Sequence, residues 1–166
     1  MRSLARLGLR ASVDDLTVAA VGARNRAEHA VTSVVLNITF DCADPGTVAR
    51  FWASVTGWVL RAQDTSPGHE EYSVGPPAWG GARLYFVAVD EPKVAKNRLH
   101  LDMVPRDGSQ QQEIARMVQL GASVLADQPP GVGWVILADP EGNEYCVEGV
   151  TSADLQRSDK GGPLAG

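Results

Sequence analysis

Apolar and polar positions alternate through residues 34–42, where the readable part of the chain begins. The polar positions of this run that share one face are Asn37, Thr39 and Asp41. A period of two is typical of a half-buried β-strand. The pattern therefore predicts a strand with one polar face and one face toward a core.

The following segment predicts a helix that begins at Asp44-Pro45 and ends at Gly57. An aspartate accepts hydrogen bonds from the free N–H groups at a helix start, and proline suits the first helical position. Glycine adopts the left-handed conformation that closes a helix. Apolar residues between these ends recur at helical spacing and predict a buried stripe: Val48, Phe51, Trp52 and Val55.

Three strands are predicted after this helix, at 58–63, 70–75 and 83–89. The same order of elements then recurs. The second set comprises a strand at 98–104, a helix at 109–120 and strands at 123–127, 134–138 and 144–148. Its helix is expected to turn three apolar residues inward: Ile114, Met117 and Val118.

Matching residues of the two sets lie about sixty residues apart. Asp107 repeats Asp44, and Gly121 repeats Gly57. Internal repetition usually means that one unit buries its apolar face only together with its copy.

The sequence therefore predicts an α+β domain at 32–150, built from two βαβββ modules that form a curved mixed sheet with a central cleft. The modules are placed at 32–90 and 97–150. Residues 1–31 and 151–166 are expected to be tails. For the first tail, an amphipathic helix and a start codon placed too early are alternatives.

Composition excludes several functions. The 166 residues are 44% hydrophobic and carry a formal net charge of −5, so the electrostatic attraction on which nucleic-acid binding depends is missing. The apolar runs are too short to cross a membrane. The two cysteines, Cys42 and Cys146, have no metal-binding or disulfide spacing, which favours the reducing cytoplasm.

Four segments carry a resemblance to a known family: Asp44-Pro45, Gly57-Trp58, the linker Glu91–Asp102 and the D-P-x-G-N turn that runs from Asp139 toward Cys146. Together they resemble the vicinal oxygen chelate superfamily, and most closely its glyoxalase-like domains of the glyoxalase, bleomycin resistance protein and dihydroxybiphenyl dioxygenase type, in an actinobacterial subgroup. The resemblance covers about residues 34–149.

The resemblance implies a divalent metal that a His and a Glu from each module hold in the cleft. His100 matches one of these four positions. Asn37 and Cys146 occupy two others, and no carboxylate occurs near residues 84–86 at the fourth. The usual four-ligand site is therefore expected to be absent, and a divalent metal held by His100 and Cys146 is left open.

Side chains that share strand faces supply the other candidates. His100, Asp102 and Glu144 are the catalytic candidates, because an imidazole and two carboxylates can move protons. The substrate-binding candidates are Asn37, Thr39, Trp79, Arg98 and Trp134. The alternatives are a solvated sheet face for Thr39 and its strand neighbours, a solvated linker cation for Arg98, and packing over a sheet edge for the Trp residues.

Two functions follow from the resemblance. The first is a domain that binds a small organic molecule in the cleft between the modules, without the usual metal site. The second is a metal-dependent lyase, isomerase or dioxygenase with a site rebuilt around His100. The partners expected are a small-molecule ligand, no nucleic acid and no membrane; a homodimer is compatible with both functions but is not required.

Overall fold

The computed structural model describes residues 34–78, 81–126 and 133–158. All of them except Val34 belong to one compact unit, Val35–Gly166. The predicted first tail and Trp79 lie outside the described residues. Within the described part of the chain, no helix is both long and apolar enough to span a bilayer.

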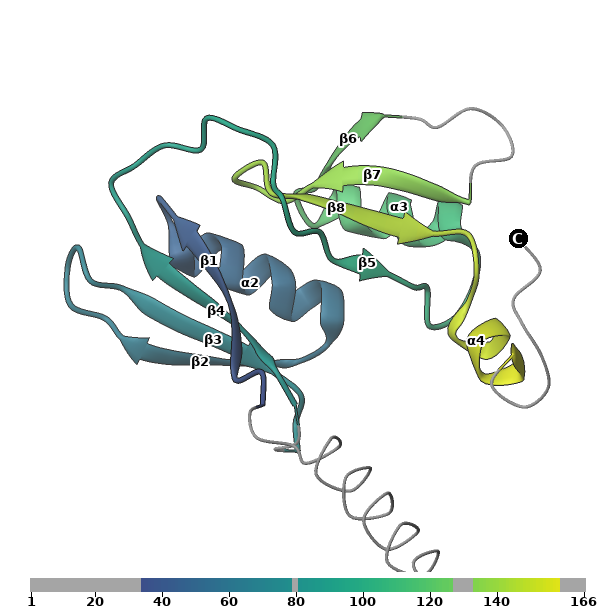
Figure 1. Ribbon diagram of the computed structural model, residues 1–166, viewed down its shortest axis with the longest axis horizontal. Helices are drawn as coiled ribbons and strands as arrows, with labels where there is room; N and C mark the ends of the chain where they lie inside the picture. Colours follow the sequence, from purple (N-terminus) through teal and green to yellow (C-terminus); the bar gives the residue numbers. More distant parts are fainter. Residues whose placement is uncertain (1–33, 79–80, 127–132, 159–166) are drawn as a thin grey trace, which may run out of the picture. The chain divides into compact units, whose positions relative to one another are not determined.

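The first module has the predicted order of elements (Figure 1). These are β1 (Asn37–Cys42), α2 (Pro45–Thr56), β2 (Val59–Asp64), β3 (Glu71–Gly75) and β4 (Arg83–Ala88). The strands form a sheet in the order β1-β4-β3-β2, with β1 parallel to β4 and the other pairs antiparallel. We call this sheet A.

The second module repeats this topology. Its elements are β5 (Asp102–Met103), α3 (Gln110–Gln119), β6 (Ser123–Ala126), β7 (Trp134–Ala138) and β8 (Glu144–Glu148), and α4 (Ser152–Ser158) follows them. The strand order is β5-β8-β7-β6, with β5 parallel to β8. The α+β fold class is confirmed, with the strands divided between sheet A and this second sheet, sheet B.

The ends of α2 form as the sequence predicts. The Asp44 carboxylate accepts a hydrogen bond from the Thr47 N–H at 3.0 Å, and Pro45 occupies the first turn. Gly57 has a φ of 68° and donates its N–H to the Ala53 carbonyl. Every residue of the predicted stripe is buried: Val48, Phe51, Trp52 and Val55.

The helix α3 is well capped but shallowly packed. Ser109 and Gln112 form a reciprocal capping box at its start. Met117 is buried and Ile114 packs against the core, whereas Val118 is 45% exposed. The inward placement of Val118 was therefore wrong, because the helix contacts β8 through a narrow stripe and Val118 lies beside it.

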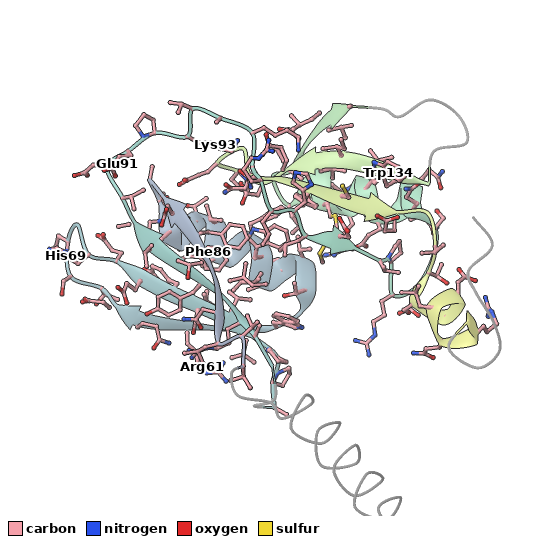
Figure 2. All side chains as sticks on the ribbon, viewed as in Figure 1. Arg61, His69, Phe86, Glu91, Lys93 and Trp134 are labelled. Carbon is pink, nitrogen blue, oxygen red and sulfur yellow. The ribbon has the colours of Figure 1, made fainter. Side chains whose placement is uncertain are left out.

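One aromatic core serves both modules. Trp52 of α2 lies 5.0 Å, centroid to centroid, from the Tyr145 ring of β8 and 5.9 Å from the Phe40 ring of β1. Phe86 of β4 extends the cluster into sheet A and is completely buried, while Arg61 and His69 lie at the surface (Figure 2). The modules are thus joined through α2.

Two boundaries differ from the predictions. The strand expected at 98–104 is reduced to β5, because His100 is engaged locally with Asn97 and Pro105 has no N–H for a ladder. The C-terminal tail expected from residue 151 begins with α4, whose Ser152 donates both its N–H and its hydroxyl to carbonyls of residues 105 and 106.

Candidate functional site

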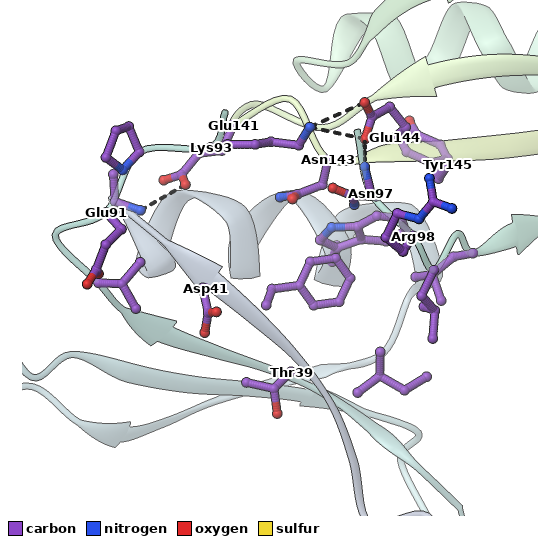
Figure 3. Close-up of a pocket in the computed structure, with 18 residues that line it drawn as sticks. Thr39, Asp41, Glu91, Lys93, Asn97, Arg98, Glu141, Asn143, Glu144 and Tyr145 are labelled. Carbon is purple, nitrogen blue, oxygen red and sulfur yellow. Dashed lines mark hydrogen bonds and ion pairs between the residues drawn. The ribbon is translucent and has the colours of Figure 1, made fainter. Parts of the chain in front are cut away.

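A cavity of about 880 Å³ lies where the two modules meet. Three segments and Trp52 of α2 line it, the segments being β1 with the adjoining Ala43, the linker at residues 89–101, and residues 141–145 around the start of β8 (Figure 3). Because β1 is an edge strand of sheet A, the cavity lies beside a sheet edge.

The strand β1 supplies side chains of both its faces. Ile38 and Phe40 belong to the face that packs toward the core, and Thr39 and Asp41 belong to the exposed face. All four line the cavity. The alternation seen in the sequence therefore places an apolar wall and a polar wall on one strand.

The D-P-x-G-N turn at residues 139–143 folds around a buried carboxylate. Asp139 is 3% exposed and accepts hydrogen bonds from the N–H groups of Glu141 and Asn143, each at 3.0 Å. It also accepts the indole N–H of Trp52 at 3.1 Å. Gly142, with a φ of 84°, allows the chain to reverse. The motif therefore fixes module two to the middle of α2.

The same turn binds the start of α2. The Glu141 carboxylate accepts the backbone N–H of Ala43 at 2.8 Å and also that of Asp44. A negative charge is favourable there because the helix dipole places partial positive charge at the N-terminus. Glu141 thus helps hold the cavity wall at β1 against module two.

The linker is fixed through Glu144, one of the predicted catalytic residues. Its carboxylate lies 3.2 Å from Lys93 Nζ and accepts the Asn97 N–H at 2.9 Å. Burial raises the pKa of Glu144, but the hydrogen bonds from Asn97 and Lys93 outweigh burial and hold that pKa below its ordinary value. Glu144 therefore lines the cavity as an anchored carboxylate.

Other polar groups of the lining are free to meet a ligand. Four lining groups form no side-chain hydrogen bond or ion pair with another described residue. They are the Thr39 hydroxyl, the Asp41 carboxylate, the Asn97 side-chain carboxamide and the Arg98 guanidinium. Thr39 and Arg98 were predicted to bind substrate, whereas Asn97 was not singled out. The sequence signal that could have identified Asn97 is its position in the linker motif.

The remaining catalytic candidates lie outside the cavity lining. His100 is exposed, and its Nε2 atom lies 2.5 Å from Lys96 Nζ and 3.1 Å from the Asn97 carbonyl oxygen. Asp102 pairs with Cys146 across β5 and β8. Of the three predicted catalytic residues, Glu144 lines the cavity. His100 and Asp102 belong to module two but lie outside the cavity lining.

Two side chains beside Asp102 have raised pKa values. Burial, and then the charge of Asp102, raises the pKa of the Cys146 thiol. The same two causes raise the pKa of the Glu148 carboxyl. Cys146 is therefore a protonated thiol at neutral pH rather than a nucleophilic thiolate.

The other predicted binding residues are separated from the cavity. Asn37 accepts a hydrogen bond from Arg83 Nε at 3.2 Å on sheet A. Trp134 is 42% exposed and begins β7, opposite Glu148. Neither residue lines the cavity.

The residues at the family's metal positions do not fit a divalent ion in this arrangement. The Lys96 ammonium lies against His100 Nε2, one of the two ring nitrogens that can bind a metal, and a metal-binding cysteine must lose the proton that Cys146 retains. Asn37 is engaged by Arg83. In residues 34–78, 81–126 and 133–158, no three His, Cys, Asp or Glu side chains are grouped to hold a metal.

A family model described as a glyoxalase-like domain matches residues 37–148. The chain belongs to the glyoxalase-like domain family. The match spans both modules from the start of β1 to the end of β8, and it includes the linker and the turn that form the cavity. No curated protein matches the chain.

Solved structures with similar folds come from the glyoxalase and bleomycin resistance group. A mutant of the fosfomycin resistance protein FosX from Listeria monocytogenes, complexed with Mn(II) and 1S,2S-dihydroxypropylphosphonic acid, is 14% identical with a TM-score of 0.58; the match covers 76% of this chain and 98% of that one. The trypanothione-dependent glyoxalase I of Leishmania major is 12% identical with a TM-score of 0.54, over 78% and 94% of the two chains.

A glyoxalase/bleomycin resistance protein/dioxygenase family enzyme from Burkholderia phytofirmans is 14% identical with a TM-score of 0.55, over 71% of this chain and 99% of that one. At these identities the likeness establishes the fold of the glyoxalase-like domain, on which many chemistries are built.

Proposed function

We propose that this glyoxalase-like domain binds a small organic molecule in the cavity between β1, the linker and the turn, without the four-ligand metal site of its superfamily. The observation that carries the proposal is a cavity of about 880 Å³ with apolar and free polar groups on its walls. Small-molecule sites in proteins have this size and this mixture of groups.

The walls of the cavity are held in place before a ligand arrives. The turn binds α2 through Asp139 and Glu141, and the linker is bound through Glu144. A preorganised wall reduces the ordering that a ligand would otherwise impose on the chain. All the lining comes from one chain, so the proposal does not require a homodimer.

The contacts of His100 and Cys146 support the first of the two predicted functions. A metal-dependent enzyme built around His100 would have to displace the Lys96 ammonium and deprotonate Cys146. The proposed binding function needs neither change, since its groups already line the cavity.

The test is a screen of a small-molecule library by thermal shift and NMR, with the full chain and a variant whose cavity is filled. Thr39→Trp places a large ring on the exposed face of β1, whereas Thr65→Trp adds the same ring to an exposed loop. We expect compounds that raise Tm by ~2 °C or more for the wild type and Thr65→Trp but not for Thr39→Trp. The proposal would be contradicted if no compound in the library bound, or if Thr39→Trp left the binding unchanged.

A further inference from the structure

Six charged side chains line the cavity, and half of them are already engaged within the protein. They are Asp41, Glu91, Lys93, Arg98, Glu141 and Glu144. Lys93 pairs with Glu144, and Glu141 binds backbone N–H groups at the start of α2. The charges of these three residues hold the cavity walls in place.

The other three charged groups have no such partner. Asp41, Glu91 and Arg98 form no hydrogen bond or ion pair through their side chains with any other described residue. Asp41 and Arg98 line the same cavity without pairing with each other, so their charged atoms lie farther apart than an ion pair allows. In the close-up, Glu91 and Asp41 lie on one side and Arg98 on the other (Figure 3).

The lining also contains apolar side chains. Phe40 of β1 and Leu99 and Leu101 of the linker are among them. The cavity therefore offers carboxylates at one end and a guanidinium at the other, with amide and apolar side chains elsewhere in its lining. A guanidinium binds a carboxylate with two parallel hydrogen bonds, and a carboxylate binds an ammonium group.

A ligand with one charge would satisfy only one end of this cavity. An anion would pair with Arg98 but would leave Asp41 and Glu91 without a counter-charge, and a cation would leave Arg98 without one. Asp41, Glu91 and Arg98 are exposed, so the gain comes from the charge-assisted hydrogen bonds that each adds with a ligand group of opposite charge. A molecule that carries both charges, separated by an apolar body, satisfies both ends at once.

We propose that the cavity recognises small amphoteric molecules, with an ammonium group bound at Asp41, a carboxylate bound at Arg98 and an apolar chain between them. This inference rests on the proposed binding function and adds the chemical class of the ligand. Its basis is the set of charges that pair with no other described residue and that lie on two sides of one cavity (Figure 3).

The experiment uses probes that share an apolar body and differ in charge. NMR titration of the full chain compares 4-aminobutanoate, 6-aminohexanoate and 8-aminooctanoate, and then compares the best of them with the carboxylate, the amine and the neutral alcohol of the same length. We expect the amphoteric probe to bind about tenfold more tightly than either singly charged probe, since a charge-assisted hydrogen bond contributes about that factor.

Paired variants assign the two ends. Asp41→Asn should reduce the affinity of the amphoteric probe to that of the carboxylate and leave carboxylate binding unchanged. Arg98→Gln should reduce the affinity of the amphoteric probe to the affinity of the amine. Asp107→Asn and Arg106→Gln remove the same charges from exposed positions outside the cavity lining and should change neither affinity.

The outcomes separate this inference from the function on which it rests. If all four probes bind with similar affinity and Thr39→Trp abolishes the binding, the cavity binds small molecules but the amphoteric preference is wrong. A singly charged probe that binds as tightly as the amphoteric one also overturns the inference. If no probe binds and the library screen finds no ligand either, both proposals fail.

Discussion

The helices α2 and α3 occupy equivalent places in the two modules but have different surroundings. α2 buries seven residues, whereas Met117 is the buried residue of α3. Both helices have well-formed caps, but α2 is largely apolar, whereas most residues of α3 are polar or charged. α2 accordingly packs on sheet A and also receives the core of module two, through Trp52 and Tyr145.

Module two holds α2 at its start, middle and end. Glu141 binds N–H groups at the start, and Asp139 binds the Trp52 indole in the middle. At the end, Arg116 of α3 donates hydrogen bonds to the carbonyls of Ser54 at 3.1 Å and Val55 at 2.9 Å. The comparison teaches that matching cap signals fix similar helices, while the apolar content of each helix and the contacts between the modules decide which helix becomes the centre.

Loss of the central ring of α2 should have the largest effect. Trp52→Ala removes a side chain that is 1% exposed and leaves the buried Asp139 carboxylate without one of its donors. We expect the free energy of unfolding to fall by about 3–5 kcal/mol, as for other large buried aromatic residues. Urea unfolding followed by circular dichroism measures this change.

Trp134→Ala is the matched control, because this ring is 42% exposed on β7. It should cost about 1 kcal/mol or less. Equal losses for the two variants would show that α2 is not the centre of the fold.

The hydrogen bonds at the end of α2 should contribute less. Arg116→Met keeps the aliphatic part of the side chain and removes the donors to the two carbonyls of α2. Since the Arg116 side chain is 40% exposed, we expect a loss of about 1 kcal/mol. Arg157→Met removes a more exposed arginine that pairs with Asp154 in α4, and urea unfolding should show almost no change for it. A null result for Arg116→Met would mean that solvent replaces these bonds at no cost.

How much of this could be predicted from the sequence depends on the distance between interacting residues. Asp44 and Gly57 mark the ends of α2 through bonds to neighbouring residues, so the helix was predicted almost residue by residue. Strand alternation placed Thr39 on the exposed face of β1. These features follow from local geometry.

The candidate site was harder to predict because its contacts join distant parts of the chain. The alternation of side chains along β8 placed Glu144 on the same face as Cys146. Nothing in the sequence indicated that the linker turns back so that Lys93 and Asn97 bind the Glu144 carboxylate. For the same reason His100 was expected within a strand, whereas local contacts with Lys96 and Asn97 hold it before β5.

The pH dependence of the linker should show the smallest effect. The folded protein holds the pKa of Glu144 below 4.5, its ordinary value, through hydrogen bonds from Asn97 and Lys93. A carboxylate whose pKa is lowered by folding contributes stability above the unfolded pKa, and the contribution is lost as pH falls through the folded pKa. The wild type should therefore lose linker protection below about pH 4.5.

Glu144→Gln should remove this pH-dependent step, because an amide does not titrate in this range. Hydrogen exchange of the Asn97 amide reports the step directly, since this N–H is donated to the Glu144 carboxylate. Glu70→Gln is the control, as its side chain has no bonded partner in the described part of the chain. If Glu144→Gln retained the acid-induced step, another group would control the linker, and the difference between a firmly held α2 and a pH-sensitive cavity wall would have to be explained without Glu144.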